Sequence, residues 1–363
     1  MSSLVYNFGA GPAMLPREVM AKAQAEFLDY QGMGASVIEI SHRSKEFNAI
    51  VDRCDELIRE LSSLPENYKI LYVHGGARMQ FSAIPMNLMP RTSAGKALYF
   101  ETGNFAKLAN KEAARYGQVE IVASSADTDY DRIPEFNAAD IDQDAAYAHI
   151  TSNNTIYGTR WNQFPDTGAV PLVADATSEM FSREIDISKF GAIYAGFQKN
   201  LGPSGLALVL IREDLLGHAM PHTPTMLDYQ VYADNHSMAN TTNTFALYML
   251  MLTLEWKVQQ GGIAALEKVN ERKAETLYQI LDDSGFYVGN AQPAHRSMMN
   301  VTFNLANTEL SDLFLKEALE NGLYALKGHR AVGGIRACIY NPMPLEGVQA
   351  LAEFMREFER TRG

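Results

Sequence analysis

Between residues 69 and 211 the sequence alternates between short apolar runs and segments with helical spacing of apolar residues. Each apolar run is short enough to form one strand. Alternating strands and helices are typical of a mainly parallel sheet with helices on both faces. The sequence therefore predicts an α/β fold with a mainly parallel seven-stranded sheet, whose strands are expected at residues 69–73, 97–101, 118–123, 146–150, 170–174, 191–195 and 206–211.

Helices are expected around this sheet, and a second structural unit is expected after it. The predicted helices of the first unit are residues 17–30, 47–61, 78–88, 105–116 and 245–259. Gly261 and Gly262 interrupt the chain, and a helix at 263–281 follows. The remaining predicted elements are strands at 299–305 and 335–340 and helices at 309–321 and 344–360. We expect them to form a small α+β domain that begins near Gly262.

Lys199 lies at the end of one apolar run and shortly before the next. The run 192–195 stops at Gly196, and Gly202, Pro203 and Gly205 mark a tight turn before the run 206–211. A lysine held between two buried strands has a lowered pKa and can act as an amine nucleophile towards a carbonyl. The ordinary alternative is a solvent-facing loop lysine, because lysine side chains are rarely buried.

Two further features fall at strand ends. Asp175 closes the apolar run 170–174, and the stretch 74–78, His-Gly-Gly-Ala-Arg, joins a strand to a helix. A glycine turn before a helix N-terminus is suited to bind an anion. Ligands of parallel sheets bind at the carboxyl ends of the strands. A lysine, a carboxylate and a phosphate cradle are the parts that hold pyridoxal phosphate, although Asp175 alone could equally be a turn or helix-cap residue.

Five motifs carry a resemblance that covers nearly the whole chain. They are residues 11–16 (GPAMLP), 41–43 (SHR), 74–76 (HGG), 198–200 (QKN) and 327–337 (KGHRAVGGIRA). In this order they resemble the phosphoserine aminotransferase family, whose members are class V, fold-type-I pyridoxal-phosphate enzymes. The resemblance implies a large cofactor-binding domain over residues 17–261 and a small domain formed by residues 1–16 and 262–363.

The resemblance also implies which residues bind the cofactor. Lys199 would bond covalently to the cofactor, and Asp175 would pair with the pyridine nitrogen. Asn240 and Thr241 would reach the cofactor of a partner subunit, which implies a homodimer with shared active sites. The other implied cofactor contacts are Ala77, Arg78, Phe105, Thr155 and Gln198. The family usually has further glycines where this chain has Ala77 and Met79, so the backbone of the cradle is expected to be less free.

The implied substrates are L-glutamate and 3-phosphohydroxypyruvate, which would give 2-oxoglutarate and O-phospho-L-serine in serine biosynthesis. Arg336 would bind the α-carboxylate, because a guanidinium can bind a carboxylate with two parallel hydrogen bonds. The distal phosphate or carboxylate would be surrounded by His42, Arg43, Arg78, His329 and Arg330. Ala10 stands where some relatives have a hydroxyl residue, and we assign it no polar role.

Composition limits the other possible functions. The formal charge of −12 argues against broad binding of nucleic acid or anionic membranes. Two widely spaced cysteines, Cys54 and Cys338, are typical of a reducing compartment and argue against a disulfide framework. The eight histidines show no spacing typical of metal ligands, so we predict no metal site. Residues 1–30 contain no long apolar segment, and we expect a cytoplasmic protein.

Three alternatives remain open from the sequence. A cysteine desulfurase, another class V enzyme, would share Lys199 and Asp175 but would need a mobile cysteine. Cys54 falls in a predicted amphipathic helix and Cys338 in an apolar strand, so neither is placed for that role. The same pocket could also act on 4-phosphohydroxythreonine in vitamin B6 synthesis. A non-catalytic protein of this fold would not need the lysine and the aspartate.

Overall fold

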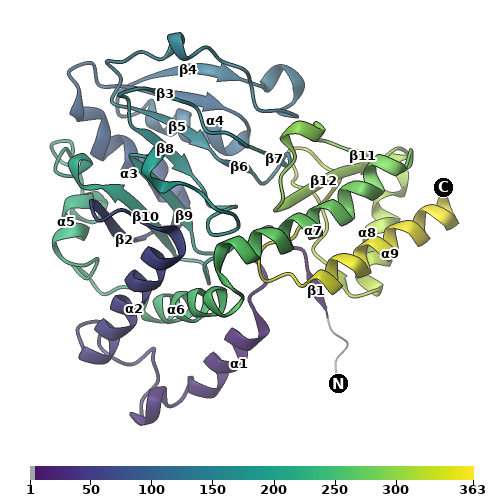
Figure 1. Ribbon diagram of the computed structural model, residues 1–363, viewed down its shortest axis with the longest axis horizontal. Helices are drawn as coiled ribbons and strands as arrows, with labels where there is room; N and C mark the ends of the chain where they lie inside the picture. Colours follow the sequence, from purple (N-terminus) through teal and green to yellow (C-terminus); the bar gives the residue numbers. More distant parts are fainter. Residues whose placement is uncertain (1–4) are drawn as a thin grey trace.

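The computed structural model describes residues 5–363 and contains a central seven-stranded sheet (Figure 1). The strand order is β2-β10-β9-β8-β5-β3-β4. The strands are β2 (Tyr68–His74), β3 (Lys96–Glu101), β4 (Gln118–Ser124), β5 (Tyr147–Thr151), β8 (Leu172–Asp175), β9 (Ala192–Gly196) and β10 (Leu206–Arg212). All pairs are parallel except those of β10, which runs antiparallel to both β2 and β9. The predicted mainly parallel sheet is therefore confirmed, with each strand close to its expected position.

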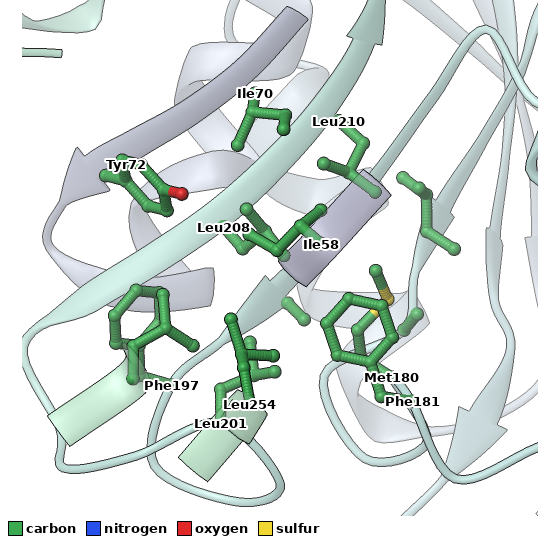
Figure 2. Close-up of a cluster of buried hydrophobic side chains, with 14 of the residues drawn as sticks. Ile58, Ile70, Tyr72, Met180, Phe181, Phe197, Leu201, Leu208, Leu210 and Leu254 are labelled. Atoms are coloured by element: carbon green, nitrogen blue, oxygen red, sulfur yellow. The ribbon is translucent and has the colours of Figure 1, made fainter. Parts of the chain in front are cut away.

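Side chains alternate between the two faces of the sheet, and each face is covered by helices. On one face, Leu208 and Leu210 of β10 belong to a core that includes Ile58 of helix α2 (Lys45–Ser62) and Leu254 of helix α6 (Thr244–Gln259) (Figure 2). The opposite face packs against α3 (Gly76–Leu88), α4 (Asn104–Ala113) and α5 (Tyr229–Asp234). Because both faces are buried, the strands are continuous apolar runs, which is why they could be recognised in the sequence.

Local signals explain where several of these helices begin and end. Helix α2 begins after Ser44, whose hydroxyl accepts a hydrogen bond from the backbone N–H of Phe47. Helix α1 (Arg17–Glu26) ends before Tyr30, so the predicted helix at 17–30 was too long. The chain instead makes a short 3-10 turn in which Gln31 has a left-handed φ of 53°. Helix α5 was not predicted, because its six residues are too few to show a helical period.

The C-terminal part of the chain forms a smaller α+β unit with its own core (Figure 1). Strands β11 (Tyr287–Gly289), β12 (Asn300–Leu305) and β14 (Ile335–Cys338) form an antiparallel sheet. Helices α7 (Gly262–Asp283), α8 (Ser311–Glu320) and α9 (Leu345–Arg362) accompany it. The prediction of two strands missed β11, whose three residues are too short to show alternation.

The N-terminal segment joins this smaller unit. Strand β1 (Tyr6–Asn7) pairs in parallel with β13 (Leu323–Tyr324). Phe8 is fully buried in the same core as β12 and α9. Residues 1–4, which the sequence assigns to the small domain, lie outside the described residues. The domain limits at 16/17 and 261/262 stay a prediction.

Candidate active site

A cavity of about 330 Å³ opens at the carboxyl ends of β5, β8 and β9. It lies where the strand-end rule for parallel sheets predicts a ligand site. The predicted site residues that line it are Ala77, Arg78, Phe105, Thr155, Asp175, Gln198, Lys199, His329 and Arg336. The fold thus gathers residues from both structural units around one pocket.

Lys199 lies in the turn between β9 and β10, with only 7% of its surface exposed. Its Nζ donates a hydrogen bond to Thr155 Oγ1 at 2.6 Å and lies 5.8 Å from the centre of the Phe105 ring. No residue among 5–363 forms an ion pair with it. Burial lowers the pKa of Lys199 to about 8, although the Asp175 carboxylate acts in the opposite direction. A substantial fraction of the amine is therefore neutral, and nucleophilic, just above neutral pH.

Asp175 is the last residue of β8, beside Thr151 of β5 and Tyr194 of β9. Its side chain is buried, and Oδ1 accepts a hydrogen bond from the backbone N–H of Thr177 at 3.0 Å. Burial raises the pKa of Asp175, while the bonds from Thr177 and the charge of Lys199 oppose that rise. The carboxylate borders the pocket, so it can accept a further hydrogen bond from a cationic N–H there.

The turn between β2 and α3 has the backbone of an anion cradle. Gly75 and Gly76 have left-handed φ angles of 82° and 63°, which disfavour any other residue. Helix α3 begins at Gly76 with no side-chain cap, so its first backbone N–H groups are free to bind a ligand. Ala77 and Arg78 both line the pocket, so the replacement of a family glycine by alanine does not close the cradle.

The N-terminal segment packs over the turn that holds Lys199. The backbone N–H of Ala13 donates to the carbonyl of Gln198 at 2.8 Å. Gly11 has a φ of 139°, and a Cβ there would lie 3.2 Å from the Gln198 side chain. Glycine at this position lets the segment approach the lysine closely.

The smaller unit supplies two further basic groups of the pocket, His329 and Arg336. Arg336 lies on β14, opposite Thr302 of β12, and His329 lies in the loop that precedes this strand. His329 Nδ1 accepts a hydrogen bond from the backbone N–H of Ala331. Burial, together with the nearby Arg336 and Arg330 charges, lowers the pKa of His329. The loop is thus folded back on itself beside the pocket.

Other predicted residues do not line this pocket. Arg43, Arg330 and Thr241 are exposed, and His42 Nε2 is buried without a hydrogen-bond partner among residues 5–363. Asn240 Oδ1 lies 3.1 Å from His74 Nε2 of the same chain, next to the cradle. The roles assigned to these residues stay predictions.

Several pocket residues were not identified from the sequence. Thr151 ends β5 beside Asp175, and its hydroxyl has no partner among the described residues. The strand-end rule could have identified Thr151. Asn153, Thr177 and Ser178 follow strand ends, but nothing in their local sequence distinguishes them from ordinary turn residues.

Comparisons with known proteins identify the family of the chain. A family model described as aminotransferase class-V matches residues 5–351. The chain is 49% identical to the phosphoserine aminotransferase of Pseudomonas paraeruginosa over 363 residues, which is 100% of both chains. The chain belongs to the phosphoserine aminotransferase family. It is a pyridoxal-phosphate-dependent aminotransferase, as the resemblance implied.

Solved structures of the family have the same fold. The phosphoserine aminotransferase of Bacillus circulans subsp. alkalophilus is 44% identical, with a TM-score of 0.96 and 100% of both chains covered. That of Trichomonas vaginalis, solved with PLP bound, is 36% identical with a TM-score of 0.91, over 97% of this chain and 99% of that one. The predicted fold-type-I architecture is therefore confirmed, and the family implies pyridoxal phosphate as the cofactor.

Residues 5–363 contain no group of three or more His, Cys, Asp or Glu side chains arranged to hold a metal ion. No helix within this range is long and apolar enough to span a membrane.

Proposed function

We propose that the chain transfers the amino group of L-glutamate to 3-phosphohydroxypyruvate, giving 2-oxoglutarate and O-phospho-L-serine in serine biosynthesis. One observation carries the proposal: Lys199 and Asp175 share a pocket with two basic residues of the smaller unit, His329 and Arg336. Each substrate is an anion at both ends, and such a pocket can pair with both.

The pocket residues fit pyridoxal phosphate. The uncapped N-terminus of α3 at Ala77 and Arg78 suits the phosphate, with Gln198 beside it. Phe105 provides an aromatic wall for the ring, and the Asp175 carboxylate suits a protonated ring nitrogen. When bound, the cofactor supplies an aldehyde that takes up the amino group and a ring that withdraws electrons from the substrate Cα.

Lys199 is proposed to hold the cofactor covalently at rest and to move the proton at the substrate Cα during turnover. Its lowered pKa of about 8 suits a group that must both accept and release a proton near neutral pH. Thr155 holds Nζ in place through the bond of 2.6 Å. Asp175, kept from water, is proposed to keep the ring nitrogen protonated by accepting its hydrogen bond.

The two ends of the substrate are assigned to different groups. Arg336 is proposed to bind the α-carboxylate, which glutamate and 3-phosphohydroxypyruvate share. Arg78 and His329 are proposed to face the distal phosphate or carboxylate, joined there by His42, Arg43 and Arg330. 4-Phosphohydroxythreonine also has an α-carboxylate and a phosphate, and we propose it as a second substrate, in vitamin B6 synthesis.

A homodimer with shared sites is proposed as the working assembly. Large apolar side chains are exposed along residues 20–38, namely Met20, Phe27, Leu28, Met33 and Ile38, with 40–82% of their surfaces accessible. A concentration of such side chains is typical of an interaction surface. Asn240 and Thr241 are then proposed to complete the partner's cofactor site.

The cysteine desulfurase alternative is not favoured. Cys54 and Cys338 are both buried, and burial raises the pKa of each thiol. Cys338 Sγ is also held by Asn300 Nδ2 at 3.2 Å. A desulfurase needs a reactive, mobile thiolate, which neither position favours.

Acceptor preference tests the proposed substrates. The cofactor-loaded enzyme is supplied with glutamate and either 3-phosphohydroxypyruvate or pyruvate, which lacks the phosphate. We expect kcat/KM for the phosphorylated acceptor to be at least about 100-fold higher, because charge-assisted bonds to the phosphate contribute about 1.5–3 kcal/mol each. Equal use of the two acceptors would refute a phosphate-binding end.

A further inference from the structure

A second hollow, with a volume of about 730 Å³, lies apart from the candidate active site. One wall is Arg160, the last residue of strand β7 (Thr159–Arg160), together with Arg296. Helix α7 also lines the hollow, through Glu271, Glu275 and Tyr278 and through Asp282, the ion-pair partner of Arg296. None of these residues lines the pocket around Lys199.

The Arg160 guanidinium has no anionic partner among residues 5–363. Its Nε is buried and bonds to no acceptor there. Neighbouring arginines are paired: Arg183 Nε donates to Glu179 at 2.9 Å, and Arg296 donates to both carboxylate oxygens of Asp282. Burial, with the nearby charge of Arg183, lowers the pKa of Arg160, although the carboxylates of Glu179 and Glu267 act in the opposite direction. A guanidinium partly removed from water without an ion pair is unfavourable, and an anion bound there would relieve that cost.

Helix α7 carries two carboxylates at this hollow that have no cationic partner in the described chain. Glu271 and Glu275 are four residues apart, hence on one face of α7, and both are exposed. Neither carboxylate has an ion-pair partner in the described chain. An inorganic phosphate at Arg160 would be repelled by these carboxylates, and a simple cation would leave Arg160 unpaired. A small molecule with one carboxylate and one ammonium group could pair with Arg160 and with the glutamates at the same time.

We propose that this hollow binds a free zwitterionic α-amino acid, whose carboxylate pairs with Arg160 and whose ammonium group faces Glu271 and Glu275. A planar guanidinium binds a carboxylate with two parallel hydrogen bonds. The phenol ring of Tyr278, over which Arg296 stacks at 4.5 Å, borders the same space.

The position of this site connects it to the active-site lysine. Strand β7 pairs with β6 (Asn153–Asn154), and the turn between them carries Thr155, the hydrogen-bond partner of Lys199. The hairpin is fastened to the smaller unit, since Ser297 N–H donates to the Gly158 carbonyl at 2.7 Å and Thr159 pairs with Arg296. An amino acid on Arg160 would contact the same hairpin that positions Lys199.

Equilibrium dialysis of the cofactor-loaded enzyme with radiolabelled L-serine tests the proposal. Amino acids also enter the active site, so the variants Arg160→Gln and Arg336→Gln are compared. We expect saturable L-serine binding whose affinity falls at least about tenfold in Arg160→Gln, because a charge-assisted hydrogen bond is lost. The same binding should persist in Arg336→Gln. The double variant Glu271→Gln, Glu275→Gln, on an exposed helix face, should weaken the same event.

Controls separate this site from its alternatives. Acetate, methylammonium and inorganic phosphate should each compete at least about tenfold more weakly than unlabelled L-serine. Each of them can pair either with Arg160 or with the two glutamates, but not with both. Arg160→Gln should melt at or above the wild-type temperature, since it removes an unpaired charge. Absence of saturable L-serine binding, binding that only Arg336→Gln removes, or displacement by phosphate as strong as by L-serine would each overturn the proposal.

Discussion

Lys199 Nζ donates a hydrogen bond to Thr155 Oγ1 at 2.6 Å, and both side chains are buried. The bond joins the turn after β9 to the turn between β6 and β7. This bond positions the amine at the carboxyl ends of the central strands. Because the Thr155 hydroxyl carries no charge, it does not form an ion pair with the amine. The lysine therefore stays a reactive group at a fixed position.

Replacing Thr155 by valine removes this bond while keeping the shape of the side chain. We expect the fold to be retained and kcat to fall about 10- to 100-fold, because a hydrogen bond to a charged group contributes about 1.5–3 kcal/mol. Thr155→Ser is the matched control and should keep most of the activity. Steady-state kinetics of the three proteins check this. A valine variant with the wild-type kcat would show that Thr155 does not position Lys199 for catalysis.

The lowered pKa of Lys199 predicts how stability depends on pH in the cofactor-free protein. Between pH about 8 and 10.5 the unfolded chain keeps the proton on this amine while the folded chain does not, so stability rises with pH. Below pH 8 both states are charged, and the burial cost is fully present, at about 3 kcal/mol.

The matched variant is Lys199→Met, which lacks the titrating amine. It should unfold at higher denaturant concentration than the wild type at pH 7, and the difference should shrink as the pH rises towards 10. Urea unfolding at several pH values measures this. A difference that does not change with pH would show that Lys199 is not desolvated.

Asp175→Asn tests the carboxylate of the pocket. The amide keeps the size of the side chain and an acceptor for the Thr177 N–H, so we expect normal folding. We expect kcat to fall by at least about 100-fold, the size seen when one preorganised electrostatic contact is removed. Retention of the cofactor absorbance, measured in the same samples, separates loss of chemistry from loss of cofactor. Near-normal turnover would exclude Asp175 as the ring partner.

Two other buried lysines provide an internal comparison. Lys257 on α6 is fully buried, its Nζ bonds to no acceptor within residues 5–363, and burial lowers its pKa to about 7. Lys273 on α7 also has a pKa of about 7, but its Nζ donates to the carbonyls of Ile339, Tyr340 and Met343.

Lys257→Met should therefore stabilise the protein by a few kcal/mol at pH 6, on the order expected for removing an unpaired buried charge. The gain should decrease as the pH rises from about 7 towards 10.5, because the wild-type amine is then neutral when folded. Lys273→Met should destabilise it, because three carbonyls lose their donor. Chemical denaturation of both variants measures the two changes in the free energy of unfolding, which should have opposite signs. Destabilisation by Lys257→Met would contradict the claim that Lys257 is an unpaired buried charge.

Much of the fold could be predicted because its central strands are buried on both faces. Strands β9 and β10 are uninterrupted apolar runs, and Asp175 and Lys199 stand out as charged residues at the ends of such runs. The antiparallel direction of β10 could not be read from the sequence, because a buried strand has the same composition in either direction. Strand β11 and helix α5 were too short to show a period.

The unpredicted parts of the site depend on contacts between distant segments. Thr151 enters the pocket because β5 lies beside β8, which is a matter of strand order. Arg160 resembles a surface arginine until the fold brings it to the same hollow as α7. Such relationships arise from packing, and no local pattern of residues records them.

Transfer of labelled nitrogen tests the central claim most directly. The cofactor-loaded enzyme is incubated with [15N]glutamate and 3-phosphohydroxypyruvate, and the products are analysed by mass spectrometry, with Lys199→Ala as the control. The account predicts 15N in O-phosphoserine, formed in equal amount to 2-oxoglutarate, and no product from the variant. Unlabelled O-phosphoserine only, no O-phosphoserine at all, or equal turnover by Lys199→Ala would contradict it.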